Sequence, residues 1–582
     1  MTDKKSPSKE SPDDGPKDGR KAAAPQSNRE TVESIVVAVM LAFLFRTFVA
    51  EAFVIPTGSM APTLMGNHKD VTCSKCGHAY QGSASCENDD RQAGNDWGTA
   101  VATTCPLCRF TMTLDWNEDA NQGTFTGDRI LVSKFSYDLS EPERWDVIVF
   151  KFPGNGKVNY IKRLIGLPNE TIKLKYGDVF IRKDGESAFR IARKPPHKQI
   201  AMMQLVDDIS QTAAIADLHK VSWPSRWQFL PDSDGLRLLE SDLQGVEVDG
   251  RADERWLRYR HVVPDGPTWA AIERAAQGGN DFGLPREFAG ELISDFGAYN
   301  AVPKIPSVLP SSFRVDPTAR YQPEPSQLGK NWVGDLAVEA DLIVADKQGQ
   351  LILDLVEGGV HFFCTIELAT GKATLSTSSE QTAFDDGEPT ADTAIRGPGK
   401  YAVRYSNFDD EIRLWVNDDL VQFAKPTTYA GTPDRVVVPG WSPDDPGDLQ
   451  PIGIGARGAR VTAHGMRVLR DIYYIASTSA YESDYDHFAG IDQSIPVVFR
   501  NPATWKTDRL FRARHERDFP LGPDQYFPMG DNSAHSADAR GWTEKYVERD
   551  LLIGKAAVVY WPHSWNRPLP LLPNVKKMRL IH

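Results

Sequence analysis

Three segments of the chain contain the side chains that could do chemistry, and the first surrounds a serine. Ser59 lies in Pro56-Thr-Gly-Ser-Met-Ala-Pro62, directly after a predicted strand at Ala52–Ile55. A nucleophilic serine needs an exposed, constrained turn, and Gly58 lets another backbone approach closely. Most serines between glycine and proline only form turns, so this segment alone is a weak signal.

The second segment places a lysine among apolar residues. Asp146–Phe152 alternates as a strand does, a Gly-rich turn follows, and Tyr160-Ile-Lys-Arg-Leu-Ile165 predicts a second strand. Lys162 and Arg163 would point to opposite faces of that strand. A buried lysine loses proton affinity and can then take the proton from a serine hydroxyl. The alternative is an exposed lysine on an edge strand.

The third segment is a polar, turn-rich loop within residues 526–542. Its side chains could hydrogen-bond to one another and brace a site, or could form an Asx-turn loop or a calcium loop. The candidates are Asp531, Asn532, Ser536, Asp538 and Arg540.

Together these segments resemble one family, the type I signal peptidases, which are membrane-anchored serine–lysine endopeptidases. Five blocks carry the resemblance, in chain order: Pro56-Thr-Gly-Ser-Met, Gly127-Asp-Arg-Ile-Leu-Val, Arg144-Trp-Asp-Val-Ile-Val-Phe, Tyr160-Ile-Lys-Arg-Leu-Ile-Gly-Leu-Pro and Gly530-Asp-Asn with Ser536-Ala-Asp-Ala-Arg. The resemblance implies a mainly β protein, with an antiparallel β-sheet catalytic core after one N-terminal transmembrane helix.

The resemblance also implies the roles of the catalytic groups. Ser59 would be the nucleophile and Lys162 the general base, with the Ser59 N–H and the Thr57 hydroxyl as oxyanion donors. Signal peptides of exported preproteins would be cut after small-x-small motifs through an acyl-enzyme. Acyl transfer of this kind needs no catalytic cofactor.

Further roles follow for residues around the dyad. Ser536 would orient the lysine, and Asp538 with Arg540 would form a supporting ion pair. Two positions depart from the family pattern: Ser533 stands where Arg is usual, and Ala539 where Ser is usual. The remaining residues implied are Asp531 and Asn532 in the bracing loop and Met60, Tyr160 and Ile161 in substrate binding.

Three other functions could use the same residues. A Ser-His-Asp hydrolase could use His535 beside Asp538, but Ser59 lacks a G-x-S-x-G elbow. In an envelope-binding protein the peptidase blocks would be a relic, and intact Ser59 and Lys162 oppose this. A self-cleaving repressor-type protease is opposed by the anchor and by the absence of a DNA-binding N-terminus.

One apolar run could anchor the catalytic part in a membrane. Residues 34–50 form 17 positions interrupted only by Arg46, and we expect a transmembrane helix over 31–50 after a solvated tail, 1–30. A core helix or a signal peptide is the alternative. Lys and Arg precede the run and are absent from 51–68, which predicts a cytoplasmic N-terminus, a single-pass inner-membrane protein and an extracytoplasmic catalytic domain in contact with lipid.

Two cysteine pairs lie between the serine and the lysine. Cys73 and Cys76, then Cys105 and Cys108, form two C-x₂-C knuckles with 28 residues between the pairs, as in a zinc ribbon. We favour a structural zinc over disulfides, although an extracytoplasmic position would permit disulfides. Cys86 and His78 are substitute ligands.

The longest stretch outside the resemblance is 201–515. Short strands with turns between them predict a β-sandwich at about 330–475, after a Pro-rich linker at 302–327. Glu411-Ile-Arg-Leu-Trp-Val-Asn-Asp-Asp-Leu-Val resembles a hairpin of laminin-G-like and concanavalin-like folds, which would allow a carbohydrate or envelope ligand. A spacer is the alternative. Trp415 is expected in the core. The predicted strands are Leu336–Val344, Leu351–Val356, His361–Leu368, Ala373–Thr377, Lys400–Tyr405, Glu411–Val416 and Arg467–Ile475.

Length and composition agree with this organisation. The 582 residues exceed what one core serves, and 66 Lys and Arg against 79 Asp and Glu give a net charge of −13, which opposes a nucleic-acid partner. The expected division is a tail at 1–30, the helix at 31–50, peptidase pieces at 51–66, 126–200 and 516–582, a Cys-pair module at 67–125 and the insertion at 201–515.

Overall fold

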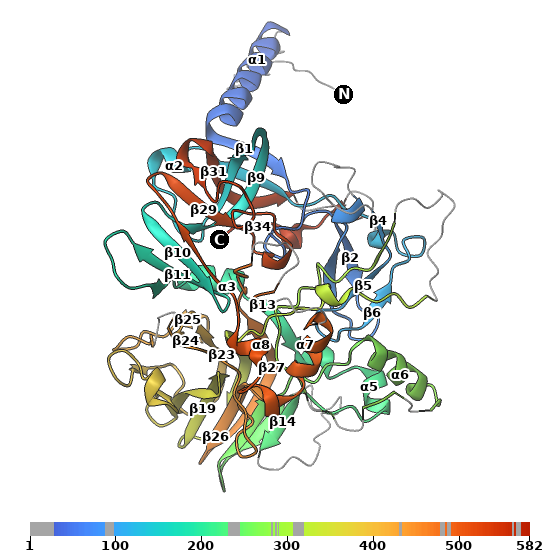
Figure 1. The fold of residues 1–582 in the computed structure, drawn as a ribbon, viewed down its shortest axis with the longest axis vertical. Coiled ribbons are helices and arrows are strands. Elements are labelled where there is room, and N and C mark those ends of the chain that lie inside the picture. The colour runs from blue at the N-terminus through green and yellow to red at the C-terminus, as the bar shows by residue number, and fades with distance from the viewer. Residues whose placement is uncertain are drawn as a thin grey trace, which may run out of the picture. The chain divides into compact units, whose positions relative to one another are not determined.

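A computed structural model describes residues 28–87, 98–230, 245–280, 283–285, 288, 290–306, 319–429, 434–477, 483–485, 491–561, 564–565 and 572–582. The protein is mainly β and divides into two compact units, 1–51 and 52–582. Figure 1 draws its helices and strands.

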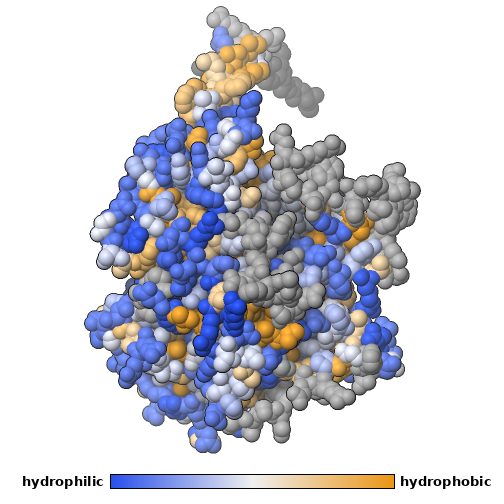
Figure 2. Space-filling model, viewed as in Figure 1, coloured by the Kyte–Doolittle hydropathy of each residue, from blue (hydrophilic) through white to orange (hydrophobic). Residues whose placement is uncertain are grey.

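The N-terminal unit is built around one apolar helix. Helix α1 covers Asn28–Leu44 and continues as a π-helical turn at Phe45–Val49. Within it, the 20 residues Glu30–Val49 are long and apolar enough to cross a membrane. Their large apolar side chains are exposed, and Figure 2 colours this helix orange. It is therefore a candidate membrane span, in agreement with the segment expected at 31–50.

Two antiparallel sheets build the part of the chain that carries Ser59 and Lys162. The first has eight strands in the order β1-β7-β31-β8-β9-β29-β30, with β34 on β31, and the second has the order β12-β11-β10-β28. The strands are β1 (Ala50–Val54), β7 (Arg129–Ser133), β8 (Val147–Phe152), β9 (Asn155–Gly166), β10 (Glu170–Lys175), β11 (Asp178–Lys183), β12 (Arg190–Ile191), β28 (Glu516–Pro520), β29 (Gln525–Met529), β30 (Val547–Glu548), β31 (Leu552–Trp561) and β34 (Arg579–Leu580).

The order of these strands joins distant parts of the sequence. Strand β9 pairs with β8, which places Ile148 opposite Lys162, and on its other side with β29, which places Met529 opposite Arg163. The lysine strand therefore lies beside the strand that leads into the bracing loop, although the large insertion separates them in sequence.

The large insertion contains a β-sandwich of two seven-stranded antiparallel sheets. Their orders are β13-β27-β18-β23-β24-β25, with β15 on β27, and β14-β16-β26-β19-β20-β21-β22. The strands are β13 (Gln204–Asp208), β14 (Trp227–Leu230), β15 (Val246–Asp249), β16 (Arg255–Tyr259), β18 (Leu336–Val344), β19 (Gln350–Glu357), β20 (Val360–Glu367), β21 (Lys372–Thr377), β22 (Thr390–Asp392), β23 (Gly399–Phe408), β24 (Glu411–Val416), β25 (Asp419–Leu420), β26 (Ile452–Arg457) and β27 (Arg460–Arg470).

The sandwich differs from the expectation in extent. Four strands come from residues 204–259, upstream of the expected 330–475, and Figure 1 shows green β14 close to orange β26. The strand expected at Arg467–Ile475 was wrong in its bounds, because β27 begins at Arg460 and ends at Arg470. In the part of 302–327 that the structure describes, β17 (Lys304–Pro306) pairs with β4 (Gly98–Ala100).

Trp415 is buried, but it does not lie between the two sheets. Its neighbours Leu414 and Val416 join the apolar cluster between the sheets, so Trp415 points to the outer face of β24. There the guanidinium of Arg404 lies 5.7 Å from the centre of its ring. Trp415 is therefore buried as expected, but the side chain of Arg404 covers part of its ring.

The Cys-pair module packs against the first part of the large insertion. Its hairpins are β2 (His68–Thr72) with β3 (Ala79–Ser83) and β5 (Ala102–Thr104) with β6 (Thr111–Thr113). One apolar cluster joins the module to α5 (Ala216–Lys220) and α6 (Gly266–Ala276), through Trp223, Trp269 and their neighbours. The other α-helices are α2 (Ser136–Leu139), α3 (Pro196–Met202), α4 (Ile209–Thr212), α7 (Ile491–Phe499) and α8 (Arg509–Arg512).

The chain that leaves the sandwich runs into the core of the two sheets that carry Ser59 and Lys162. Ile472, Tyr474 and Ala476 are buried with Trp145, Phe527 and other residues of β9, β10 and β29. Residues 472–476 therefore contribute apolar surface to the core of these two sheets.

Candidate active site

The nucleophile candidate lies on a tight turn directly after β1. The amide of Ala61 donates to the Gly58 carbonyl at 3.0 Å, and the amide of Leu64 to the Met60 carbonyl at 2.8 Å. Met60 and Leu64 are fully buried with Ile55 and hold the turn against β7 and β31. Ser59 at its tip is 9% exposed, and the turn thus presents a nearly buried hydroxyl.

Strand β9 brings Lys162 to that hydroxyl. The Nζ of Lys162 donates to Oγ of Ser59 at 2.7 Å and to the carbonyl of Ile161 at 3.0 Å. Lys162 is 4% exposed, and its burial lowers the pKa to about 8, although the carboxylates of Asp538 and Asp531 act in the opposite direction. A lysine with that pKa can lose its proton near neutral pH and accept one from a serine.

Tyr160 and Ile161 flank the lysine on β9. The Nζ of Lys162 lies 5.3 Å from the centre of the Tyr160 ring, which stacks on Phe152 and meets Trp542 edge-on. Ile161 packs against the cluster that holds Met60. All three expected substrate-binding residues therefore lie beside the Ser59–Lys162 pair.

The bracing loop contains the Asp538–Arg540 ion pair. Nε and Nη2 of Arg540 donate to the carboxylate of Asp538 at 2.8 and 2.9 Å, and the amide of Gly530 donates to it at 3.1 Å. Burial raises the pKa of Asp538, but Arg540 and these donors outweigh burial and lower it overall. The expected Asp538–Arg540 pair is thus present in the loop.

Asp531 pairs with the residue next to the lysine. Nε and Nη2 of Arg163 donate to its carboxylate, each at 2.7 Å, and the Thr63 hydroxyl donates at 2.5 Å. Arg163 is fully buried on the face of β9 opposite Lys162. The sequence indicated that the two side chains diverge, but it gave no signal that Arg163 would join Asp531 to the nucleophile turn.

Asn532 contacts the nucleophile turn directly. Its side-chain amide donates to the Gly58 carbonyl at 2.9 Å, and its backbone amide to the Ser59 carbonyl at 3.1 Å. Gly530 packs as closely, because a Cβ added there would overlap the Ser59 carbonyl. Thr57, the expected oxyanion donor, is half-buried, and a Cβ on Gly66 would overlap its carbonyl group.

Ser536 is the expected residue whose contacts differ most from the expectation. It is buried, yet its hydroxyl has no hydrogen-bond partner of normal geometry among the residues that the structure describes. It lies beside Gly530, where an added Cβ would overlap its Oγ. The expected orienting contact with Lys162 is therefore absent from the described hydrogen bonds.

Ser533 and Ala539, the two departures from the family pattern, contact residues 472–476, which follow the last strand of the sandwich. Ser533 Oγ accepts from the Ile475 amide at 2.9 Å and from Arg540 at 3.1 Å, and Arg540 also donates to the Ile475 carbonyl at 2.8 Å. Ala539 is buried in the cluster that contains Ile472 and Tyr474. Small residues at these positions leave room for residues 472–476.

His535 does not have the environment that a triad needs. Burial, helped by Lys330, lowers its pKa to about 4. Asp538 is bound by Arg540, and Ser59 is bound by Lys162. The geometry therefore favours lysine over histidine as the base for Ser59.

Four cysteines converge in the Cys-pair module. The Sγ atoms of Cys73, Cys76, Cys105 and Cys108 all lie within 4.8 Å of one another, and all are free thiols. Cys73–Cys108 and Cys76–Cys105 are each 3.6 Å apart, close to the roughly 3.8 Å between sulfurs of a tetrahedral zinc site. The donor set fits a structural zinc ion. Cys86 lies outside this group, where burial raises its pKa to about 11.

Comparisons with known proteins bear on these residues. The family model described as "Signal peptidase, peptidase S26" matches residues 28–79, 107–221 and 454–561, which include Ser59, Lys162 and the bracing loop. A probable signal peptidase I-2 of Synechocystis is 26% identical over 269 residues, which are 42% of this chain and 94% of that protein. Signal peptidase I P of Bacillus subtilis subsp. natto is 23% identical over 222 residues, 37% of this chain and 84% of the relative.

Similarity to solved structures adds little to the sequence comparisons. A galectin of Caenorhabditis elegans is 11% identical over 23% of this chain and 83% of its own, with a TM-score of 0.17, which is too low to support a conclusion. The sequence matches leave the gaps 80–106 and 222–453 within the peptidase region. The protein is a type I signal peptidase, a serine hydrolase of the S26 family.

Proposed function

We propose that this peptidase cleaves signal peptides from exported preproteins after small-x-small motifs, with Ser59 as nucleophile and Lys162 as general base. The observation that carries the proposal is the 2.7 Å contact between Lys162 Nζ and Ser59 Oγ inside a buried site. The lowered pKa of Lys162, about 8, supports its role as a proton acceptor.

The proposed reaction has two half-reactions. Neutral Lys162 takes the proton of Ser59 as Oγ attacks the scissile carbonyl, and the Ser59 N–H with the Thr57 hydroxyl stabilises the oxyanion. The lysine ammonium then protonates the leaving amine, which leaves the signal peptide esterified to Ser59. Water, deprotonated by Lys162, hydrolyses the ester and restores the serine.

Substitution of the two residues tests this proposal. With a synthetic substrate carrying an Ala-x-Ala site, Ser59→Ala and Lys162→Met are each expected to lose cleavage by about 10³-fold or more while remaining folded. Ser406→Ala, a buried serine of the sandwich, and Lys198→Met, a buried lysine whose partner Asp146 also contacts Lys555, are the matched controls. Robust cleavage by either dyad variant would exclude the proposal.

We also propose the membrane topology. The candidate span Glu30–Val49 would anchor the protein with its N-terminus in the cytoplasm and residues 52–582 outside, because Lys and Arg gather before the span. Protease added to intact spheroplasts should then degrade the catalytic part. Protection of that part until lysis would contradict the orientation.

The four-cysteine group is proposed to bind one structural zinc ion. Its thiolates would supply the complete tetrahedral set, with no position for substrate or water. Metal analysis of purified protein should give one zinc per chain, and Cys105→Ser should release it. Zinc well below one per chain, without free thiols after denaturation, would favour disulfides instead.

The domain division is a proposal of the same kind. The peptidase would consist of the pieces 51–66, 126–200 and 516–582, interrupted by the Cys-pair module at 67–125 and the insertion at 201–515. A carbohydrate or envelope ligand for the sandwich stays a second candidate function beside a spacer role, and a glycan-binding assay on the full chain would separate them.

A further inference from the structure

The large insertion touches the nucleophile turn through two neighbouring residues. Tyr299 and Asn300 lie in the gap 222–453 that the family model leaves unmatched. Tyr299 is buried and Asn300 half-buried. Both approach the turn that carries Ser59, one through packing and the other through hydrogen bonds.

Asn300 completes the hydrogen bonds of Asn532. Its Nδ2 donates to Oδ1 of Asn532 at 2.7 Å, and Nδ2 of Asn532 donates back to Oδ1 of Asn300 at 2.8 Å. The second hydrogen of that Asn532 amide goes to the Gly58 carbonyl at 2.9 Å. The side-chain oxygen and both side-chain N–H groups of Asn532 are therefore hydrogen-bonded. These bonds fix the orientation of the Asn532 side chain, which in turn holds the turn that carries Ser59.

The ring of Tyr299 packs against the same turn. A Cβ added to Gly58 would overlap the Tyr299 ring, so the ring occupies the space that only glycine leaves open. The Tyr299 hydroxyl donates to the Asn67 carbonyl at 2.9 Å, and the Tyr299 carbonyl accepts from the Ser83 amide at 3.0 Å. Both ends of the residue are therefore fixed.

The Cys-pair module holds this strip of the insertion in place. The amide of Thr104 donates to the Ala301 carbonyl at 3.1 Å, and that of Val101 to the Pro303 carbonyl at 3.0 Å. Arg109, next to Cys108, lies 3.3 Å from the centre of the Phe296 ring. The two insertions together thus support residues 296–303 behind the turn.

We propose that Tyr299 and Asn300 are positioning residues of the peptidase: they fix the Thr57–Ser59 turn so that Ser59 Oγ stays within reach of Lys162. The proposal rests on the proposed role of Ser59 as nucleophile. It makes the insertion part of the device that sets the geometry of the dyad, in addition to any ligand that the sandwich binds.

The first test separates positioning from stability. Asn300→Ala in the full chain should lower kcat on the Ala-x-Ala substrate by about tenfold with little change in KM, because the dyad loses alignment while the binding surface stays. Asn407→Ala removes a buried sandwich amide that bonds Glu357 and Tyr429, and it should lower the melting temperature without changing kcat per folded molecule. Unchanged kcat in Asn300→Ala would overturn the role of Asn300.

The second test uses the contact with Gly58. Gly58→Ala should abolish most activity because its methyl group collides with the ring, and Tyr299→Ala in the same chain should restore at least tenfold of the loss by removing the ring. No restoration in the double variant would overturn the role of Tyr299. Ser59→Ala is assayed in parallel: its activity would refute the proposed nucleophile, whereas an inactive Ser59→Ala with full activity in Asn300→Ala refutes only the positioning role.

Discussion

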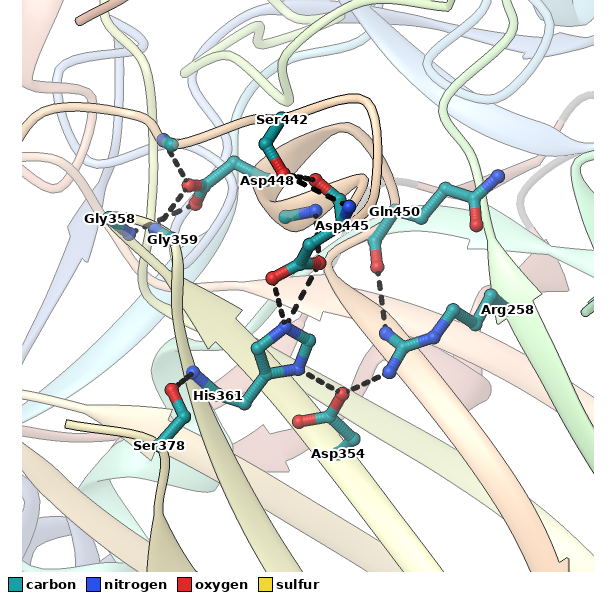
Figure 3. Close-up of polar contacts among 12 residues, drawn as sticks. Arg258, Asp354, Gly358, Gly359, His361, Ser378, Ser442, Asp445, Asp448 and Gln450 are labelled. Atoms are coloured by element: carbon teal, nitrogen blue, oxygen red, sulfur yellow. Dashed lines mark hydrogen bonds and ion pairs between the residues drawn. The ribbon is translucent and has the colours of Figure 1, made fainter. Parts of the chain in front are cut away.

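A buried lysine in the peptidase and a half-buried histidine in the sandwich both lie near two carboxylates, but their proton affinities shift in opposite directions. In the sandwich, Nδ1 of His361 lies 2.7 Å from Asp354 and Nε2 lies 3.0 Å from Asp445. Figure 3 draws both contacts. Burial acts to lower the pKa of His361, but these two hydrogen bonds outweigh it and raise the pKa to about 9. In the peptidase, the pKa of Lys162 falls to about 8.

The difference lies in which groups make direct contact. Lys162 touches a hydroxyl and a carbonyl, while Arg540 and Arg163 bind the nearby carboxylates. His361 touches the carboxylates themselves. Direct contact with two carboxylates therefore keeps the proton on His361, whereas burial without such a contact lowers the proton affinity of Lys162. The first arrangement suits a structural link, and the second suits a base.

The largest expected effect comes from a cation that cannot lose its proton. Lys162→Arg should reduce kcat/KM by about 10³-fold, because arginine stays charged at any working pH and cannot accept the serine proton. His361→Lys, which keeps a positive charge in the sandwich, should leave kcat/KM within about twofold, since distant sites act independently. Near-normal cleavage by the arginine variant, measured with its melting temperature as a control for folding, would break the comparison.

The pH dependence of cleavage gives a second test of the comparison between Lys162 and His361. In the wild type, kcat/KM should rise with pH through about 8 as Lys162 loses its proton. Asp538 favours the charged lysine, so Asp538→Asn should move this rising limb down by on the order of one pH unit. Asp445→Asn is the matched control in the sandwich. A limb that stays in place or moves up in Asp538→Asn would contradict the assignment.

The raised pKa of His361 predicts an effect on stability instead of activity. Its pKa is raised above the usual value of 6.5, so its stabilising contribution is present below about pH 6.5 and is lost as the pH rises through about 9. His361→Gln should cost about 1–3 kcal/mol in the free energy of unfolding at pH 6 and almost nothing above pH 9. Denaturant melts at both pH values measure this, and a difference that does not depend on pH would count against it.

The smallest effect should come from the exposed partner of the histidine. The side chain of Asp445 is 44% exposed, whereas that of Asp354 is fully buried and also binds Arg258. Asp445→Asn should therefore cost less than about 1 kcal/mol, because water screens the pair. Asp354→Asn should cost more, and the reverse order in the same melts would show that burial does not govern this network.

The sequence predicted the contact between Ser59 and Lys162 better than it predicted the residues that support this contact. Ser59 and Lys162 stand in motifs, and strand alternation indicated which way Lys162 and Arg163 point. The Arg163–Asp531 pair joins positions 368 residues apart, and the role of Tyr299 depends on how an insertion packs. Neither leaves a local pattern, because both arise from tertiary contacts.

The absence of a local pattern also explains the errors in the predicted strands. Strands of the sandwich core were predicted where apolar alternation is regular, as at Leu336–Val344 and Glu411–Val416. The upstream strands β13 to β16 span only four or five residues each, too short for a period of two to stand out in the sequence. Residues 472–476 are apolar like a strand, but their partners are the peptidase core and Ser533.

A direct titration of Lys162 tests the central claim. In detergent micelles, protein labelled with ¹⁵N-lysine would give an Nζ signal that is absent from Lys162→Met, and its chemical shift can be followed from pH 6 to 11. The account predicts a midpoint near pH 8. A midpoint at or above 10.4, the value of an ordinary lysine, would mean that Lys162 is charged when the enzyme works and is not its base.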